Sequence, residues 1–230
     1  MLKIENLCKI YNKTDILKDI NIDLKSNESI AIVGESGSGK STLAKLILKL
    51  EKPTKGKITL NKKKVSVVFQ DYRSSVNPIF TIKQIIDEAF WQTSHTILES
   101  ELEIYLKKLE LDNSILEKFP HELSGGQLQR VCILRSLLSN PSFLILDEAL
   151  SALDVSTKVN IISLLQELKN KKNLTYFLIT HDLEVATALC ENIKVLYKGQ
   201  IVESLKSNNL KHIKHPYTKE LLNSIVLLKD

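Results

Sequence analysis

The sequence predicts an α/β fold with a mainly parallel sheet, and three observations support this prediction. Short apolar runs that resemble strands alternate along the chain with segments of helical periodicity. One of these runs leads straight into a glycine-rich loop, and a helical segment follows that loop. Another apolar run ends in two adjacent carboxylates. Because parallel strands joined by helices end at one edge of their sheet, we expect ligands to bind at that edge.

The size and composition are those of an ordinary globular protein. The chain has 230 residues, which is enough for one large domain with its own core. No apolar run approaches the roughly 18 residues that a membrane span needs. The N-terminus is interrupted by charged residues and does not resemble a secretion signal. We therefore expect the chain to stay in the cytoplasm, so that any membrane role comes through a partner.

The charge argues against a nucleic-acid site, and the cysteine spacing argues against a disulfide or a cysteine-ligated metal site. The net charge of +5 is mild, and no aromatic residues interleave with the lysine clusters. These clusters favour a solvated surface over a nucleic-acid site. Cys8, Cys132 and Cys190 lie far apart without a CxxC spacing, which favours reduced thiols over a disulfide or a metal site.

The first 69 residues are predicted to contain strands and one helix. Apolar and polar residues alternate on either side of the turn-like NKTD, which is typical of a β-hairpin. The third strand leads into the glycine loop, and the last two strands are joined by a lysine-rich turn. The expected strands are 3–11, 16–25, 29–33, 57–60 and 65–69, and the expected helix is 40–50.

The middle of the chain changes to a helical pattern. From Thr81 to about Phe119 strand signals are absent, so we expect a helical subdomain, at about residues 78–138, inserted into the α/β fold. The whole chain, 1–230, is expected to be a single domain. The helices expected in this region are 81–92, 101–111 and 125–138.

The last third is predicted to alternate strands and helices again. A buried strand, FLIL, precedes a long helix with an aspartate at its start. A hairpin is expected around Lys198-Gly199, and a helix with one apolar face follows it. The expected strands are 143–146 and 174–180, the hairpin is 193–203, and the helices are 154–171, 182–190 and 216–228.

The glycine-rich loop GESGSGKST has the spacing of a nucleotide phosphate loop. Its glycines let consecutive N–H groups turn toward one anion, and the following helix adds its positive end. Lys40 is expected to reach the β- and γ-phosphates, and the Ser41 hydroxyl to bind Mg²⁺. A strand before the loop and a helix after it disfavour a chance glycine-rich turn. The loop residues are Gly34, Glu35, Ser36, Gly37, Ser38, Gly39, Lys40, Ser41 and Thr42.

The two carboxylates at the end of FLILDE, Asp147 and Glu148, also support the prediction of a nucleotide site. A strand end places them at the same sheet edge as the phosphates. Asp147 is expected to hold Mg²⁺, directly or through water, as in other phosphate-loop ATPases. Glu148 is expected to polarise the attacking water. Alternatively, these carboxylates could be a structural cap on a helix that follows the strand. The phosphate loop in the same sequence favours the functional interpretation.

A second glycine-rich segment, HELSGGQLQR, begins another helix but has no lysine of its own. Its LSGGQ, placed ahead of FLILDE, resembles the signature of ABC-type ATPases, and this resemblance covers nearly the whole chain. In that family the signature contacts the ATP bound to a partner subunit. The matching residues here are Leu123, Ser124, Gly125, Gly126 and Gln127.

The resemblance also implies roles for residues outside these motifs. Gln70 matches the family glutamine that touches Mg²⁺ and water and senses the transmembrane partner. His181 matches the histidine that contacts the γ-phosphate, and Tyr11 the aromatic ring that stacks on adenine. The dimer-interface loop of the family matches Ser151, Ala152, Leu153 and Asp154. The implied catalytic residues are Glu148, His181, Lys40 and Gln70, and the implied Mg²⁺ ligands are Ser41, Gln70 and Asp147.

What the resemblance implies is an ATPase that uses ATP and Mg²⁺ to energise membrane transport. The implied partners are a second ABC ATPase subunit, two transmembrane permeases and an extracellular solute-binding protein. We expect the second ATPase to be a different chain. The implied location is peripheral, on the cytoplasmic face of the membrane.

Two shorter segments narrow the resemblance to one branch. NPIFTI and HPYTKELL resemble importers of oligopeptides, dipeptides and nickel. Three features depart from the usual pattern: a short stretch between Lys57 and Gln70, Ala149-Leu150 after Glu148, and an early end after HPYTKELL. The compact build favours a metal or metal-chelate importer over a peptide importer.

Two other functions stay open at this point. One is a soluble ABC-type ATPase that serves cofactor assembly, which co-purification with membrane proteins would distinguish. The other is a regulatory nucleotide-binding module that has lost catalysis. Intact Lys40, Asp147, Glu148 and His181 argue against that second alternative.

Overall fold

The computed structural model describes residues 1–61, 64–90, 99–210 and 213–226. The chain divides into two compact units. Unit 1 combines Met1–Lys63 with Thr175–Asp230, and unit 2 is the continuous segment Lys64–Leu174. Each unit therefore has its own strands and helices. Some of the sequence motifs lie in unit 1 and the others lie in unit 2.

Unit 1 begins with a small antiparallel sheet. Its strands are β1 (Leu2–Tyr11), β2 (Thr14–Leu24) and β4 (Lys55–Leu60), with β1 in the centre. The predicted hairpin is confirmed, because β1 and β2 pair in antiparallel register from Leu2↔Leu24 to Tyr11↔Thr14. The buried residues of both strands are apolar and mostly two positions apart, as expected of strands with one face on a core, and the register shifts after Ile4 of β1.

The second sheet of unit 1 contains the strand that leads to the phosphate loop. Strand β3 (Ile30–Val33) pairs in parallel with β7 (Thr175–Thr180) and with β8 (Asn192–Tyr197). Strand β9 (Gln200–Lys206) pairs antiparallel with β8, which confirms the second predicted hairpin. Every residue of β3 and β7 is buried, which explains why these strands are continuous apolar runs in the sequence.

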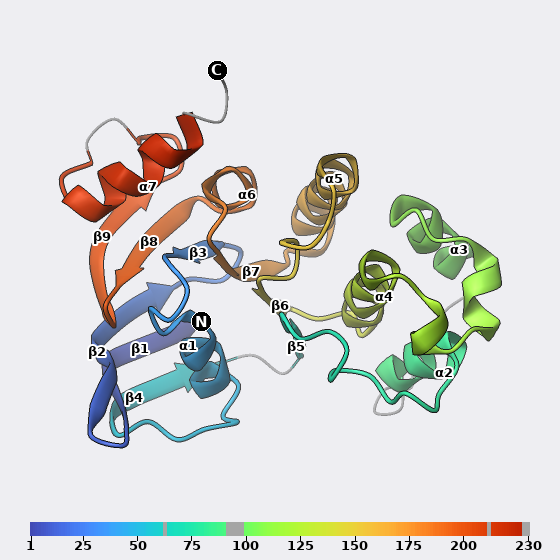
Figure 1. The fold of residues 1–230 in the computed structure, drawn as a ribbon, viewed down its shortest axis with the longest axis horizontal. Helices are drawn as coiled ribbons and strands as arrows, with labels where there is room; N and C mark the ends of the chain where they lie inside the picture. Colours follow the sequence, from blue (N-terminus) through green and yellow to red (C-terminus); the bar gives the residue numbers. More distant parts are fainter. Residues whose placement is uncertain (62–63, 91–98, 211–212, 227–230) are drawn as a thin grey trace. The chain divides into compact units, whose positions relative to one another are not determined.

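Three helices accompany the sheets of unit 1 in its described residues. They are α1 (Lys40–Ile47), α6 (Leu183–Leu189) and α7 (Pro216–Val226), and Figure 1 shows α7 beside β9. The two sheets are joined by a backbone hydrogen bond, in which the N–H of Lys18 donates to the Gly199 carbonyl at 2.8 Å.

Unit 2 combines two parallel strands with four α-helices in its described part. Strands β5 (Val65–Val68) and β6 (Phe143–Asp147) pair in parallel. Helix α2 packs on α4, and α3 packs on α5 (Figure 1). The helices are α2 (Ile82–Asp87), α3 (Glu99–Lys108), α4 (Gly125–Leu138) and α5 (Val155–Lys172), and 3₁₀ turns lie at Glu88–Phe90, Asn113–Glu117 and Pro120–Glu122.

Several predicted helices end earlier than expected. The helix predicted at 40–50 is α1 (Lys40–Ile47), and Lys49 beyond it has a left-handed backbone (φ 59°). Helix α2 changes to a 3₁₀ turn at Glu88, whose carboxylate accepts a hydrogen bond from Arg135 of α4 at 3.2 Å. The predicted end of that helix, at residues 91–92, lies outside the described residues. Helix α3 ends at Lys108 because Glu110 takes a left-handed backbone (φ 52°), which a helix cannot continue.

The two strands flanking the lysine-rich turn belong to different sheets. Strand β4 pairs with β1 in unit 1, whereas β5 pairs with β6 in unit 2. In the described part of the chain, no helix is both long enough and apolar enough to cross a membrane.

Candidate functional site

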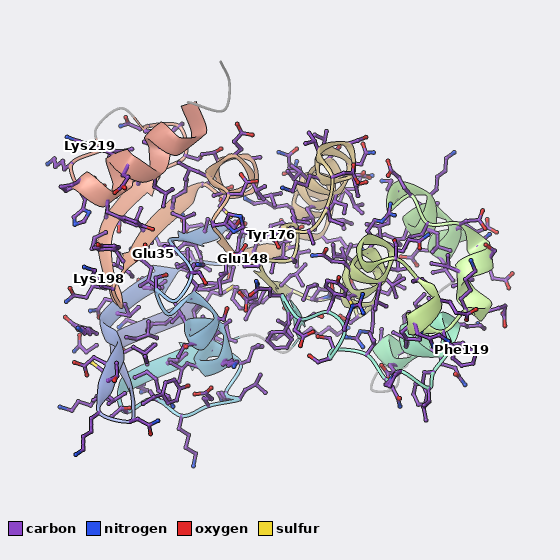
Figure 2. All side chains as sticks on the ribbon, viewed as in Figure 1. Glu35, Phe119, Glu148, Tyr176, Lys198 and Lys219 are labelled. Atoms are coloured by element: carbon purple, nitrogen blue, oxygen red, sulfur yellow. The ribbon has the colours of Figure 1, made fainter. Side chains whose placement is uncertain are left out.

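The phosphate loop lies in unit 1 between β3 and α1, and Glu35 marks it in Figure 2. Two of its glycines are required by the backbone. A Cβ at Gly34 would collide with the backbone oxygen of Leu196, and Gly39 has a φ of 106°, which favours glycine. Gly39 also precedes the first turn of α1, where N–H groups and the helix dipole favour an anion.

Lys40 is held inside this loop. Its side chain is almost fully buried, and its Nζ donates to the carbonyls of Gly34 at 2.8 Å and Glu35 at 2.9 Å. Ser38 is buried as well, and its Oγ has no hydrogen-bond partner among the described residues. A buried cation and an unpaired buried hydroxyl are donors that fit a phosphate group.

His181 lies at the same sheet edge as the phosphate loop. The parallel register pairs Val33 of β3 with Thr180 of β7, so Gly34 and His181 each follow the last pair. His181 is exposed. The turn that carries it is fixed, because Asp182 caps α6 by accepting two backbone N–H groups, those of Glu184 and Val185.

Tyr11 lies at the end of β1 in unit 1. Its ring is 37% exposed, and its hydroxyl donates to the Glu51 carboxylate. The ammonium of Lys9 lies 4.6 Å from the ring centroid. Since Lys9 covers one ring face, the other face is the one that a base could stack on.

In unit 2, the predicted residues Gln70, Asp147 and Glu148 lie at the carboxyl ends of neighbouring strands. The parallel register pairs Val68 of β5 with Leu146 of β6; Asp147 follows that pair directly, and Gln70 and Glu148 follow it by two residues. Both carboxylate residues are buried, with exposures of 3% for Asp147 and 7% for Glu148, whereas Gln70 is exposed. Buried carboxylates at a strand end are an expected feature of a phosphate-handling edge.

Glu148 has an unusual backbone conformation. Its φ of 51° is left-handed, which costs an L-residue about 1–2 kcal/mol. The carbonyl of Glu148 accepts hydrogen bonds from the Ser151 N–H at 3.2 Å and the Ser151 Oγ at 2.8 Å. Ser151 therefore supports a strained residue, and such strain concentrates at functional sites.

The signature segment forms the start of α4 in unit 2. Ser124 caps this helix: its Oγ accepts the Gln127 N–H at 3.2 Å, and the Gln127 side chain accepts the Ser124 N–H at 2.9 Å. Gly125 and Gly126 form the first helical turn. Leu123 is buried, whereas Ser124 is exposed. The segment therefore presents a capped helix start to the exterior of its own unit.

The predicted interface loop ends at the start of α5. Ser151 and Ala152 are exposed, and Leu153 is buried. The Asp154 carboxylate accepts the Thr157 N–H at 3.0 Å as the helix cap, and hydrogen bonds from Thr157 lower the pKa of Asp154. The aspartate expected at the start of this helix is therefore its cap.

Sequence reasoning assigned no role to Gln129, which the structure connects to the end of β6. Gln129 is 1% exposed, and its Nε2 donates to the Ala149 carbonyl at 2.5 Å. It lies on a helix whose other residues are largely buried. The sequence did contain a signal for this contact, namely a polar residue within a largely buried helix. A buried polar group needs a hydrogen-bond partner.

Arg130, the next residue of α4, was missed as well. Its guanidinium donates to the carbonyls of Leu109 and Glu110 and to the Glu110 carboxylate, at 3.2–3.4 Å. Arg130 therefore fixes the start of α4 to the chain segment after α3.

The residues expected to hold Mg²⁺ suit that ion. Ser41, Gln70 and Asp147 offer a hydroxyl, an amide oxygen and a carboxylate, and Mg²⁺ prefers such oxygen ligands. Within the described ranges, His, Cys, Asp and Glu form no group of three or more that could hold a metal. A single carboxylate is nevertheless compatible with Mg²⁺, because substrate phosphates and water supply its other ligands.

Comparison with known proteins identifies the family. Residues 17–151, more than half of the chain, match the family model described as ABC transporter. A nickel import system ATP-binding protein, NikE of Staphylococcus aureus (strain N315), is 42% identical and aligns with 97% of this chain and 99% of its own. A metal-staphylopine import system ATP-binding protein, CntF of Staphylococcus aureus (strain NCTC 8325 / PS 47), is 38% identical over 96% of this chain and 98% of its own.

A solved structure agrees with these sequence relatives. The dimeric structure of MJ0796, a bacterial ABC transporter cassette, has a TM-score of 0.83 and 30% identity, and it covers 91% of this chain and 100% of its own. The same cassette has been solved in a post-hydrolysis state bound to ADP and phosphate. The ordered motifs, the family match and the near full-length relatives agree, and the chain belongs to the ABC transporter family as an ATP-binding subunit.

Proposed function

We propose that this chain hydrolyses ATP to energise a membrane importer whose cargo is nickel or another metal chelate. The observation that carries this proposal is the 42% identity with a nickel import ATP-binding protein across 97% of the chain. The second relative belongs to a metal-staphylopine import system, so both relatives named above favour metal cargo over peptides. The intact phosphate loop and the two carboxylates at the end of β6 support hydrolysis rather than a regulatory role.

In unit 1, the phosphate loop binds the nucleotide. Backbone N–H groups within Gly34–Thr42 hold the phosphates, apart from that of Glu35, which donates to the Tyr217 hydroxyl. The buried Lys40 ammonium exchanges its carbonyl partners for phosphate oxygens. His181 contacts the γ-phosphate, and the exposed face of Tyr11 stacks on adenine. Binding the phosphates needs hydrogen-bond donors, which the loop provides. Stacking on adenine needs an aromatic surface, which β1 provides.

Ser41, Gln70 and Asp147 are the residues that would hold Mg²⁺. The ion, when bound, supplies positive charge that neutralises the phosphate oxygens. The protein would contribute a hydroxyl from α1, an amide oxygen after β5 and a carboxylate at the end of β6.

Glu148 acts on the water that attacks the γ-phosphate. Its carboxylate orients this water and accepts its proton, an effect worth on the order of 10²–10⁴ in rate for a positioned base. The side chain is 7% exposed, and the bonds from Ser151 fix the backbone that carries it. Positioning and charge stabilisation account for the rest of the rate, as expected for phosphoryl transfer.

The signature residues Leu123–Gln127 act on ATP bound to a second ATPase subunit. Ser124 and the first N–H groups of α4 cap that γ-phosphate, and Ser151–Asp154 lie at the interface. We propose that this subunit is a different chain, and that two permeases and an extracellular solute-binding protein complete the complex. The chain is a peripheral protein on the cytoplasmic face of the membrane. Residues 1–230 act as a single ATP-binding domain, and its helical subdomain is about residues 78–138.

The proposal is tested by metal uptake in cells that carry a deletion of this chain. Restoring the wild-type chain should restore uptake of radioactive nickel supplied with a chelator. Lys40→Ala should lose nucleotide affinity and should not restore uptake, although the protein accumulates normally. Peptide uptake measured in the same cells is the matched control. Restored peptide uptake with unchanged nickel uptake would overturn the cargo assignment, and full nickel uptake with Lys40→Ala would overturn the role of ATP.

A further inference from the structure

Helix α7 is fixed to the β8–β9 hairpin at its start. The Glu203 carboxylate of β9 accepts the backbone N–H groups of Lys214 at 2.7 Å and His215 at 3.4 Å. Burial opposes the charged form of Glu203, but these donors lower its pKa below the ordinary value. The carboxylate therefore stays charged at neutral pH and holds the chain just before α7 in place.

The first turn of α7 also contacts the end of β8. The ring of Tyr217 stacks on Tyr197 with a centroid distance of 4.2 Å and an interplanar angle of 23°. Both contacts hold the first turn of α7 against the same hairpin. The ring of Tyr217 therefore has a defined place, and the direction of its hydroxyl is defined with it.

The Tyr217 hydroxyl reaches the phosphate loop. Its oxygen accepts the backbone N–H of Glu35 at 2.7 Å, which connects two residues 182 positions apart in the sequence. Burial raises the pKa of Tyr217, so the hydroxyl stays protonated at neutral pH. A neutral phenol that accepts a backbone N–H leaves the charge of the loop unchanged.

Glu35 is held on both sides of its backbone. Tyr217 binds its N–H at 2.7 Å, and the Lys40 ammonium binds its carbonyl at 2.9 Å. Glu35, Ser36 and Gly37 are exposed, and a Cβ added at Gly37 would have no atom within 4 Å. Packing around this half of the loop is therefore sparse, so hydrogen bonds to its backbone matter more for its conformation.

We infer that Tyr217 is a positioning residue that keeps the first half of the phosphate loop in its binding conformation. The inference rests on the proposed ATP binding, in which Lys40 leaves the Glu35 carbonyl for phosphate. Once Lys40 has left, the Tyr217 bond still holds Glu35 from its other side. The HPYTKELL segment thereby has a physical role in nucleotide affinity that its position near the C-terminus does not suggest.

The test compares three full-length proteins: wild type, Tyr217→Phe and Tyr197→Phe. Tyr217→Phe keeps the stacked ring and removes only the hydroxyl. Tyr197→Phe is the matched control, because it removes the hydroxyl of the other stacked ring and leaves the Glu35 bond intact. The measurements are the Kd for Mg·ATP by calorimetry, the free energy of unfolding, and hydrogen–deuterium exchange of the loop peptide that contains Glu35.

Tyr217→Phe should raise the Kd for ATP about three- to tenfold, the range that corresponds to one neutral hydrogen bond. The Glu35 amide should exchange faster in the same variant, and Tyr197→Phe should match wild type in both measurements. An unchanged Kd would overturn the inference, even if Tyr217→Phe unfolds more easily, because a purely structural role affects stability alone. An equal rise in both variants would overturn it too, because the ring stack would then be responsible. Failure of wild type to bind ATP would refute the proposed function, while the exchange of the Glu35 amide would still decide whether Tyr217 positions the loop.

Discussion

The fold does not require Gly126 of the signature helix, so its replacement should stabilise the chain and stop its function. Gly126 has an ordinary helical backbone in the first turn of α4, and a Cβ there would lie 3.7 Å from the nearest atom, on Leu153. Glycine in a helix costs about 0.5–1 kcal/mol relative to alanine. Gly126→Ala should therefore raise the unfolding temperature by about 1–4 °C for a chain of this size.

The same substitution should slow ATP turnover in the assembled complex by on the order of 100-fold, the effect expected when one N–H donor is held away from a transition-state oxygen. The reason is that the added methyl group would occupy the place where we propose that the γ-phosphate of the second subunit's ATP meets the helix start. Thermal unfolding of the isolated chain and phosphate release by the complex are the two assays. Ser163→Ala, on the exposed side of α5, is the control, because it should also stabilise a helix and leave turnover unchanged. A lower unfolding temperature for Gly126→Ala, or normal turnover, would refute the reasoning.

Two further predictions concern Glu148 and Cys132. Glu148→Gln keeps the shape of the buried side chain, so ATP binding and stability should persist while ATP turnover falls by about 10²–10⁴-fold. Unchanged ATP turnover in a purified complex would show that Glu148 does not activate the water. Burial raises the pKa of Cys132 to about 11 from an ordinary 9.0, so the folded state favours the neutral thiol. Its stabilising contribution should be complete below pH 9 and should be lost as the pH rises toward about 11. Denaturant unfolding across this range should show a steeper decline for wild type than for Cys132→Ala, and identical slopes would contradict the burial argument.

Much of the fold could be predicted because its signals are local. Strand β3, the glycine loop and α1 follow one another within a short stretch, and each has its own periodicity or turn chemistry. The register of β3 with β7 then places Gly34 and His181 at one edge, which is where the sequence predicts ligands. Local pattern and sheet geometry were therefore enough to predict where these residues lie.

Features that depend on distant contacts could not be predicted. Helix α3 ends early at Lys108, before the left-handed Glu110, whose carboxylate accepts hydrogen bonds from Thr157 and Asn160 of α5. The bond between Tyr217 and Glu35 likewise joins opposite ends of the chain. Periodicity contains no information on such pairs, because it reports which face of a helix is apolar and not which residue it meets.

The turn between Glu148 and Ser151 has a consequence for how catalysis depends on assembly. Ser151 holds the Glu148 carbonyl by two hydrogen bonds, and it begins the segment that we propose to lie against the second subunit. A partner that shifts this segment would also shift Glu148, the residue that we propose to activate water, because the two lie only three residues apart. If both proposed roles hold, contact between the subunits and activation of water are coupled through the hydrogen bonds from Ser151 to Glu148.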